Sequence, residues 1–327
     1  MTNTELEMTE VAVGIDIGAT NTAICVVDRK GTCSAESALS TTAFDDVGEF
    51  VKSLHVAMQQ MLDKLQCRDA LKGIGIGAPN GNYYSGTIEF APNLRWRGII
   101  PLVDLVKQYY SVPVVLTNDA NAAAIGEMMY GGAKGMRDFI VITLGTGVGS
   151  GIVANSGLLY GHDGFAGEIG HTIVDPHGRQ CGCGRRGCLE AYASASGIKR
   201  TVFDLIADTT LPSELRKVPF DELTATMITE AAKRGDKLAL EAFDYTGRIL
   251  GLKLADAVAH TSPEAIFLFG GLALAGEFIF EPTKRYMEEN MLNIYKNKVK
   301  LLPSGLRENA AVLGASALVW KELKLVE

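Results

Sequence analysis

The sequence predicts an α/β protein built from two related lobes. Its 327 residues are more than one hydrophobic core usually organises, and 47% of them are hydrophobic, which is enough to fill two cores. Strand-like apolar runs alternate with helical patterns along the chain. The segment 139–157 also repeats the pattern of 11–31, in which two apolar strands flank a Gly/Thr turn and a glycine closes the unit. Such self-similarity predicts an α/β architecture in each lobe.

The first part of the chain predicts a small antiparallel sheet followed by alternating helices and strands. Between residues 11 and 39, short β-branched runs separated by turn residues predict three antiparallel strands. Apolar residues then recur every three or four positions between Val47 and Leu65, which predicts a helix with one apolar face. We expect next a buried strand at 73–79, a short helix at 101–110, a strand at 112–119 and an alanine-rich helix after it.

The second part of the chain begins with the repeated strand–turn–strand pattern and continues with helices and strands in alternation. The predicted order is a helical region from about 223 to 260, a buried strand at 265–271, a helix near 278–290, a strand at 299–303 and a last helix from 309 to about 321.

Composition and charge limit the possible classes of function. The net charge of −7 provides no basic field for a phosphate backbone, which argues against a nucleic-acid partner. The sequence has no run of 18 apolar residues, and its start lacks the charged-then-apolar order of a signal peptide. We therefore expect a cytoplasmic protein with no membrane partner. Cys25, Cys33 and Cys67 are scattered in apolar or strand-like surroundings, where reduced buried thiols are the default.

Metal-ligating side chains are concentrated in the segment 167–190, GEIGHTIVDPHGRQCGCGRRGCLE. Three thiolates and one imidazole form a complete tetrahedral set for zinc, and the glycines between them let a tight loop bring sulfurs within about 2.3 Å of one ion. Four protein ligands leave no open position for an activated water. The spacing therefore predicts a closed, structural Zn²⁺ site whose ligands are His171, Cys181, Cys183 and Cys188.

Two alternatives for this segment stay open from the residues alone. Cys181 and Cys188 would form a disulfide in an oxidising compartment. His177 would replace His171 as the nitrogen ligand. A Gly-x-Gly-x-x-Gly pattern at 182–187 matches the dinucleotide fingerprint formally, but no strand precedes it, so we discount it.

Two Gly/Thr turns have the features of phosphate-binding loops, because small residues let backbone N–H groups approach a phosphate and hydroxyls add donors. They lie at 16–22 (DIGATNT) and 144–151 (LGTGVGSG). No Walker lysine is present, so neither is a P-loop. Either turn alone is equally typical of a tight hairpin. Two facing copies favour a cleft that clamps a triphosphate from both sides.

Asn118 and Asp119 fall at the carboxyl end of a predicted strand, where ligands of α/β sheets gather. An Asn-Asp pair is equally typical of a helix cap. The residues alone leave both interpretations open.

The motifs DIGATNTAICVVD, TNDANAAAIGE, LGTGVGSGI, GEIGH and CGCGRRGCLE, in this order, resemble the ROK family of sugar kinases and repressors in the actin/hexokinase/heat-shock-protein superfamily. The resemblance covers nearly the whole chain. It implies two ribonuclease-H-like lobes around a central cleft, with the zinc loop 171–188 in the second lobe. The expected lobes are 1–118 with 306–327, because the last helix crosses back to the first lobe, and 119–305.

The resemblance also implies a role for individual residues. Asp119 is the expected catalytic base. The first phosphate loop, at 16–22, departs from the family's usual pattern, with Ala19 in place of a glycine and Asn21 in place of a lysine. Sugar contacts fall on Asn118, Glu168, His171 and Glu190, and further sugar-loop matches are Gly81, Asn82 and Asn93. The zinc ligands are His171, Cys181, Cys183 and Cys188. Nucleotide contacts fall on Asp16, Gly18, Ala19, Thr20, Asn21, Gly145, Thr146, Gly147, Gly270 and Gly271.

These roles imply ATP-dependent phosphorylation of a hexose, with Mg²⁺ near Asp16 and a structural Zn²⁺. A sugar hydroxyl is a poor nucleophile at neutral pH, so a carboxylate must accept its proton as the phosphoryl group moves in line. With one nitrogen of His171 on the metal, the other can only donate to a substrate oxygen. Glu168 and Glu190 would accept hydrogen bonds from the sugar hydroxyls. The alternative is that both are ordinary surface residues with no functional role.

The segment APNLRW resembles that of the family's glucokinases, so glucose is the first expected substrate. N-acetylmannosamine, N-acetylglucosamine and fructose are the alternatives within the kinases. A sugar-responsive repressor is disfavoured, because the first strand is predicted to begin near Val11 and leaves no room for the DNA-binding module of such repressors. A non-catalytic sugar sensor is disfavoured by the presence of Asp119. The resemblance also implies a homodimer.

Overall fold

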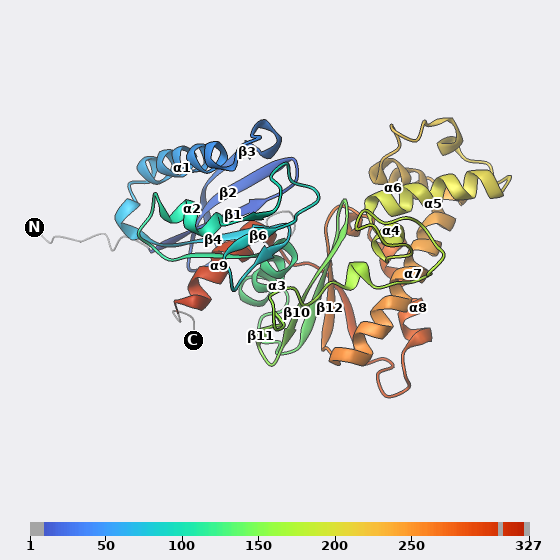
Figure 1. Cartoon of the computed structure of the whole chain (residues 1–327). Coiled ribbons are helices and arrows are strands. Elements are labelled where there is room, and N and C mark those ends of the chain that lie inside the picture. Colours follow the sequence, from blue (N-terminus) through green and yellow to red (C-terminus); the bar gives the residue numbers. More distant parts are fainter. Residues whose placement is uncertain (1–9, 307–309, 324–327) are drawn as a thin grey trace, which may run out of the picture. The chain divides into compact units, whose positions relative to one another are not determined.

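The computed structural model describes residues 10–306 and 310–323, and this part of the chain forms two compact units. Unit 1 contains the described residues up to Gly135, the segment Tyr160–Ala166 and the last helix; unit 2 contains Met136–Leu159 and the residues from Gly167 to Leu306. Each unit holds one five-stranded sheet with helices packed against it (Figure 1). The α/β class predicted from the sequence is confirmed.

The boundary predicted after residue 118 is corrected, because the alanine-rich helix α3 (Asp119–Met129) belongs to unit 1. This helix packs closely against the last helix α9 (Ala310–Glu322): a Cβ atom at Gly314 would overlap the carbonyl oxygen of Ala122. The return of the chain's last helix to unit 1 agrees with the predicted discontinuity. The predicted start of that helix, Asn309, lies outside the described residues.

The sheet of unit 1 has the strand order β3-β2-β1-β4-β8. The first three strands form the predicted antiparallel meander, and β4 and β8 extend it in parallel with β1. The parallel pairs place the carboxyl ends of β1, β4 and β8 at one edge of the sheet. The strands span Val11–Ile17 (β1), Asn21–Asp28 (β2), Cys33–Ser40 (β3), Leu71–Ala78 (β4) and Val114–Asn118 (β8).

The two faces of this sheet carry side chains of different size, because successive residues of a strand point to opposite faces. Large residues of β1 and β4 join the core that includes the helix α1 (Val47–Lys64). Glycines alternate with them on the opposite face. Side chains at Gly14 and Gly75 would overlap backbone oxygens of α9, so only glycine lets this helix lie so close to the sheet. Figure 1 shows α1 and α9 on opposite sides of the sheet.

Unit 1 also contains a three-stranded sheet, β5-β6-β7, that the sequence analysis did not predict. Its strands are only two or three residues long and were too short to give a periodic signal: Gly81–Asn82 (β5), Thr87–Glu89 (β6) and Ile99–Ile100 (β7). The short helix α2 (Leu102–Lys107) follows, with Pro101 as its N-cap residue. Asp46 caps α1 by accepting a hydrogen bond from the Glu49 amide at 3.0 Å.

The sheet of unit 2 repeats the strand–turn–strand start of unit 1 and has the order β11-β10-β9-β12-β13. β9 and β10 are antiparallel, and β12 pairs in parallel with both β9 and β13. The predicted resemblance between the segments 11–31 and 139–157 is therefore confirmed at the level of the strands. The strands span Phe139–Leu144 (β9), Val148–Ala154 (β10), Gly157–Leu158 (β11), Ala265–Phe269 (β12) and Lys300–Pro303 (β13).

The helical part of unit 2 differs from the prediction in two ways. The region from 223 to 260 is two helices, because Gly235 has a φ of +80° and Asp236 caps the second helix. A helix at 195–208 was not predicted. The helices span Glu190–Ala193 (α4), Ala195–Asp208 (α5), Ala225–Lys233 (α6), Lys237–Thr261 (α7) and Glu277–Asn290 (α8). Short 3₁₀ helices lie at Thr41–Ala43, Arg68–Ala70, Ile169–His171, Glu214–Lys217 and Ala273–Ala275.

Two of the three scattered cysteines differ from the expected state. Cys25 and Cys33 lie on the adjacent antiparallel strands β2 and β3, their Cα atoms are 6.0 Å apart, and the structure joins them as a disulfide. The expectation of isolated thiols was wrong for this pair, because the hairpin of β2 and β3 brings two residues that are eight positions apart in the chain onto neighbouring strands. Cys67 is free and buried, as expected.

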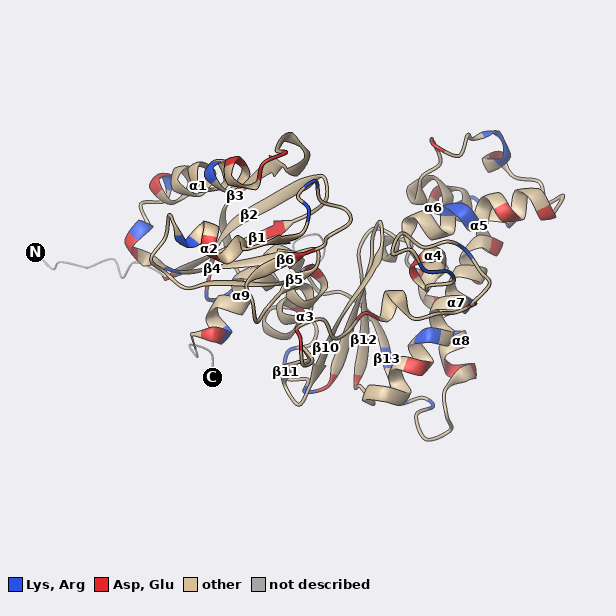
Figure 2. Cartoon of the chain, viewed as in Figure 1, with Lys and Arg blue, Asp and Glu red and all other residues tan. Residues whose placement is uncertain are grey.

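Charged residues of both signs are interspersed along the helices of both units (Figure 2). Within the described part of the chain, every helix is too short or too polar to cross a lipid bilayer.

Candidate active site and metal cluster

Asp119 lies at the carboxyl end of β8, where it begins α3. Its Oδ1 atom accepts a hydrogen bond from the Ala120 amide at 2.8 Å, and Oδ1 of Asn118 accepts from the same amide at 2.9 Å. The capping interpretation is therefore correct for Asn118, which is the N-cap residue of the helix. Burial raises the pKa of Asp119, against the opposing effect of these amide contacts.

Asp16, near the end of β1, lies close to Asp119 in unit 1. Gly77 of β4 separates the two residues: a Cβ atom there would be 3.5 Å from the Cα of Asp119 and 3.7 Å from Oδ1 of Asp16. Burial, together with the nearby charge of Asp119, raises the pKa of Asp16 to about 7. Burial opposes ionisation of both neighbouring carboxyl groups, and a divalent cation with oxygen ligands would favour their charged forms.

The first Gly/Thr turn connects β1 to β2 as a tight hairpin. The Gly18 amide donates to the Asn21 carbonyl at 2.9 Å, and the Thr41 amide donates to the Thr20 carbonyl at 2.8 Å. Ala19, Thr20 and Asn21 are exposed at the tip of the turn. The turn is thus a hairpin with accessible polar groups, a geometry compatible with phosphate binding.

The second Gly/Thr turn lies in unit 2 between β9 and β10, where hydrogen bonds within the turn and from the start of α5 support it. The Gly145 amide donates to the Gly147 carbonyl at 3.0 Å, the Ala195 amide donates to the Gly145 carbonyl at 2.9 Å, and Oγ of Ser196 donates to the Thr146 carbonyl at 3.2 Å. The start of α5 therefore positions the turn. Ala195 and Ser196 were not predicted as site residues, because helix α5 itself was not predicted.

The predicted adenosine loop at Gly270 and Gly271 lies beside the same turn. The Leu272 amide donates to the Leu144 carbonyl at 3.0 Å, which fixes this loop to the end of β9. Gly270 has a φ of +101°, and a Cβ atom there would be 2.7 Å from the Leu144 carbonyl oxygen. Glycine is therefore required at 270 for both reasons. The structure brings 145–147 and 270–271 together within unit 2.

The predicted zinc ligands form one cluster in unit 2. Ligand atoms of His171, Cys181, Cys183 and Cys188 all lie within 4.8 Å of one another. The Cys183 and Cys188 sulfurs are 3.6 Å apart, and the Cys181 sulfur is 3.8 Å from Nδ1 of His171. Zinc bonds of about 2.0–2.3 Å in a tetrahedron require ligand separations of roughly 3.6–3.8 Å. The arrangement of the four side chains therefore fits a tetrahedral metal ion.

The geometry also decides between the alternatives for this segment. Cys181, Cys183 and Cys188 are free cysteines, so the 181–188 disulfide is not formed. The nitrogen in the cluster belongs to His171, while the His177 amide donates to Oδ1 of Asp175 at 2.9 Å in a turn. Burial opposes ionisation of Cys183, but the backbone amide and guanidinium of Arg185 outweigh it and lower the pKa of this thiol to about 6. Cys183 is therefore the most readily ionised thiol of the cluster, whereas burial raises the pKa of Cys181 and of Cys188.

Glu190 connects the metal cluster to the second Gly/Thr turn. Its Oε2 atom accepts from the Val148 amide at 3.1 Å, and the Cys181 thiol donates to Oε1 at 3.5 Å. Gly147 lies directly against this carboxylate, and a Cβ atom there would overlap it. Glu190 is half-buried, so the interpretation of it as an ordinary surface residue was wrong. Glu168 is exposed and immediately precedes the 3₁₀ helix that ends at His171.

The predicted sugar-loop residues have different environments. Gly81 is buried, and a side chain there would overlap the Thr117 carbonyl. Asn82 is also buried: its Nδ2 donates to the Asp163 carbonyl at 2.8 Å and to Oε1 of Glu89 at 3.1 Å, and its Oδ1 accepts from the Tyr84 amide at 2.9 Å. Asn93 is exposed in a turn. Asn82 thus holds protein segments together with both ends of its amide.

The segment Tyr160–Ala166, missed by the sequence analysis, explains these contacts. It belongs to unit 1 although the residues on both sides of it belong to unit 2. The rings of Tyr160 and Tyr83 stack with centroids 4.1 Å apart, and the Tyr84 hydroxyl donates to the Gly161 carbonyl at 3.1 Å. The segment therefore docks onto β5 and the turn between β5 and β6. In the sequence, the only sign of this contact was the presence of tyrosines at 83, 84 and 160.

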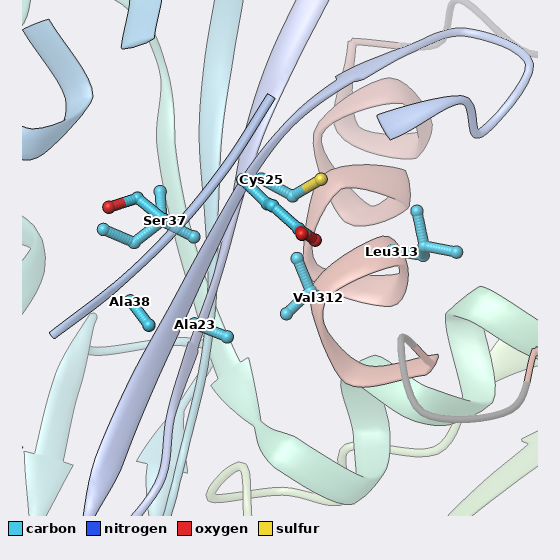
Figure 3. Close-up of a pocket in the computed structure, with 8 residues that line it drawn as sticks. Ala23, Cys25, Ser37, Ala38, Val312 and Leu313 are labelled. Carbon is cyan, nitrogen blue, oxygen red and sulfur yellow. The ribbon is translucent and has the colours of Figure 1, made fainter. Parts of the chain in front are cut away.

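A cavity of about 350 Å³ lies in unit 1 between the hairpin β2–β3 and helix α9 (Figure 3). The cavity is lined mostly by apolar side chains, and Glu36 is the only charged residue among the described residues that line it. It therefore lacks the several converging polar groups that a sugar site needs. None of the predicted site residues lines it. The labelled lining residues are Ala23, Cys25, Ser37, Ala38, Val312 and Leu313.

Comparisons with known proteins agree with this arrangement of motifs. The chain is 34% identical over 321 residues to a glucokinase of Halalkalibacterium halodurans, covering 96% of each protein. It is 33% identical, with a TM-score of 0.80, to the crystal structure of a ROK family glucokinase from Streptomyces griseus in complex with glucose and AMPPNP, covering 94% of this chain and 98% of that one. A xylose repressor of Caldicellulosiruptor bescii is 29% identical, covering 95% of this chain and 78% of the repressor. A family model described as ROK family matches residues 12–322. The chain belongs to the ROK family.

Proposed function

We propose that this protein transfers the γ-phosphoryl group of ATP to a hexose hydroxyl, with glucose as the first substrate. The observation that carries the proposal is the carboxylate of Asp119 at the carboxyl end of β8, with its pKa raised by burial and with Asp16 beside it. The similarity to glucokinases over nearly the whole chain, including one bound to glucose and AMPPNP, supports the choice of substrate and donor.

In the proposed reaction Asp119 accepts the proton of the attacking hydroxyl. A bond forms between that oxygen and the γ-phosphorus, and the bond from phosphorus to the leaving oxygen of ADP breaks. A carboxylate with a raised pKa is a better base than an ordinary aspartate at neutral pH. Mg²⁺ would neutralise phosphate charge near Asp16, and backbone amides of the turns at 16–22 and 145–147 would contact the phosphates. The adenosine would lie against Gly270 and Gly271.

The metal cluster has an indirect role in this proposal. A zinc ion held by His171 and the three cysteines would supply a rigid centre, because four protein ligands leave no position for a reactive water. Nδ1 of His171 faces the sulfurs, so Nε2 is left to donate to a sugar hydroxyl. Asn118, Glu168 and Glu190 would bind further hydroxyls, with Gly81, Asn82 and Asn93 shaping the sugar loop.

The remaining expectations follow from the same proposal. The two units would act as the lobes of an actin-like ATPase around a central cleft. The acidic balance of the chain favours small-molecule partners over nucleic acid. We also propose a cytoplasmic location and a homodimer, the usual form of the resembled family.

The test is the variant Asp119→Ala in a coupled assay of ADP release. We expect turnover to fall at least about a thousandfold, while glucose binding measured by calorimetry changes by less than about tenfold, because the base acts mainly in the transition state. Asp104→Asn is the control, since Asp104 is an exposed aspartate in the first turn of another helix of unit 1. Retained turnover in Asp119→Ala would show that Asp119 is not the catalytic base.

A screen of hexoses decides the substrate. We expect glucose to be phosphorylated with the highest kcat/KM among glucose, fructose, N-acetylglucosamine and N-acetylmannosamine. A preference for an acetamido sugar would reassign the substrate but keep the chemistry.

The similarity to a xylose repressor supports a second candidate, a sugar-responsive DNA-binding protein. Specific DNA binding that weakens with salt and with sugar, in the absence of ADP release, would favour it over the kinase.

A further inference from the structure

Arg185 contacts three of the four members of the metal cluster. Its Nη2 atom donates to the backbone carbonyl of His171 at 2.8 Å, and its guanidinium lies beside the sulfur of Cys183. Its backbone adds a further contact, because the Arg185 carbonyl accepts from the Cys181 amide at 2.9 Å, and the Arg185 amide also lies near the Cys183 sulfur. The predicted site did not include this residue.

The side chain and the backbone of Arg185 do different things. The backbone contacts shape the turn between Cys181 and Cys188 and would survive a change of side chain. Only the guanidinium reaches across to His171, which is ten residues before Cys181 in the chain. A planar guanidinium can hold a carbonyl oxygen and a sulfur at once, whereas an ammonium group lacks this fixed fork.

Charge gives the guanidinium a second role. Three thiolates and a neutral imidazole around a divalent ion leave a net charge of about −1. Arg185 is the cation in direct contact with these ligands, and it offsets this charge beside the Cys183 sulfur. Its neighbour Arg186 instead donates to the Gly178 carbonyl at 3.3 Å. Arg186 is therefore a suitable control for Arg185, because it is the adjacent arginine but makes a different contact.

We propose that Arg185 is a positioning residue that fixes the backbone of His171 relative to the cysteine turn, so that the imidazole keeps one nitrogen on the metal and the other toward the sugar. The part concerning the sugar rests on the proposed function. The part concerning the metal does not depend on it. In this proposal Arg185 acts through His171 and makes no contact with ATP or the reacting hydroxyl.

The experiment compares Arg185→Ala, Arg185→Lys and Arg186→Ala as purified zinc-loaded proteins with intact circular dichroism. The first readout is the rate at which each protein loses zinc to a chelator that reports metal by absorbance. We expect about tenfold faster loss from Arg185→Ala and a wild-type rate from Arg186→Ala. Arg185→Lys should lie close to wild type, because it keeps the charge.

The second readout is the KM for glucose at saturating ATP, together with glucose binding in the absence of ATP. We expect both to weaken about tenfold in Arg185→Ala and in Arg185→Lys, which loses the fork, while kcat changes less than about threefold. Equal zinc loss and equal KM in Arg185→Ala and Arg186→Ala would overturn the proposal. If Arg185→Ala does not fold, the glucose KM and glucose binding of Arg185→Lys and Arg186→Ala carry the comparison, and equal values in these two variants would overturn the proposal.

The two readouts separate the failure of this proposal from failure of the proposed function. If the wild-type protein phosphorylates no hexose, the proposed function fails, and the zinc-loss rates still decide whether Arg185 holds the cluster. If the kinase is active but Arg185→Ala resembles Arg186→Ala in both readouts, Arg185 has no positioning role.

Discussion

At the scale of single residues, the burial of Asp16 links its pKa to the pH dependence of the protein's stability. Its pKa is raised to about 7, mainly by burial, whereas an aspartate in the unfolded chain titrates near 4. Between these values the folded protein holds a proton that the unfolded chain has released. The free energy of unfolding therefore falls as the pH rises from about 4 to 7.

The variant Asp16→Asn removes this effect because an amide does not ionise. We expect the variant to gain stability relative to wild type as the pH rises, with the gap widening by about 2 kcal/mol between pH 5 and pH 8. Urea unfolding in magnesium-free buffer at the two pH values measures it. Asp104→Asn controls for the substitution itself. A gap that stays constant, or that narrows at pH 8, would contradict the raised pKa.

Some site residues were predictable and others were not, for physical reasons. The cluster of His171 and three cysteines could be predicted from the sequence, because the short spacings place these residues in one loop. The location of Asn118 and Asp119 could be predicted because they follow a predicted strand. Arg185 was present in the same motif, but its contact with His171 depends on a loop conformation that spacing does not encode. Asn82 likewise contacts Asp163 only after a distant segment has folded back.

At the scale of elements, the packing of α9 against the small-residue face of unit 1 depends on very close backbone contacts. Gly314 faces α3, where a Cβ atom would overlap the Ala122 carbonyl. We expect Gly314→Ala to destabilise the protein by about 3 kcal/mol, because two helix backbones must separate. The free energy of unfolding from denaturant titration measures this.

Gly48→Ala in α1 is the matched control. Gly48 is also a helical glycine, but it is exposed, and the nearest atom to an added Cβ is Oδ1 of Asp46 at 3.0 Å. There we expect a change within about 1 kcal/mol, since alanine has the higher helix propensity. Equal losses at the two positions would mean that α9 does not pack as described.

The elements themselves were largely predictable where periodicity was strong. The three strands of the first meander and α1 fall within a residue or two of their predicted ranges, because alternation and a 3.6-residue period are local signals. The strands β5, β6 and β7 have only two or three residues each, so pairing with neighbours defines them. Helices α4 and α5 were missed because they come immediately after the cysteine segment, whose glycines interrupt any period before them.

At the scale of the whole molecule, the cluster of His171 and three cysteines belongs to unit 2 alone, so removing the proposed zinc ion should affect the two units unequally. In the loop that carries the cluster, the Val174 amide donates to the Gly187 carbonyl at 2.7 Å and the Leu189 amide donates to the Thr172 carbonyl at 2.9 Å. After chelation we expect these amides to lose most of their protection from hydrogen exchange. The amides of β1 and β4 in unit 1 should keep theirs.

Hydrogen exchange followed by mass spectrometry, with and without the chelator, makes the comparison. The β1 and β4 peptides serve as the internal control. Unchanged protection across 171–190 would show that the loop does not depend on a metal, and equal loss in both units would show that the ion supports the entire fold.

The position of α9 in the chain affects how the protein is made. Unit 1 receives this helix only from residues 310–322, which follow the whole of unit 2 in the sequence. On the ribosome, the glycine-lined face of β1 and β4 must therefore wait until all of unit 2 has been translated before it is covered. We expect the nascent polypeptide to complete unit 2 first and to need chaperone protection for this open sheet in the meantime.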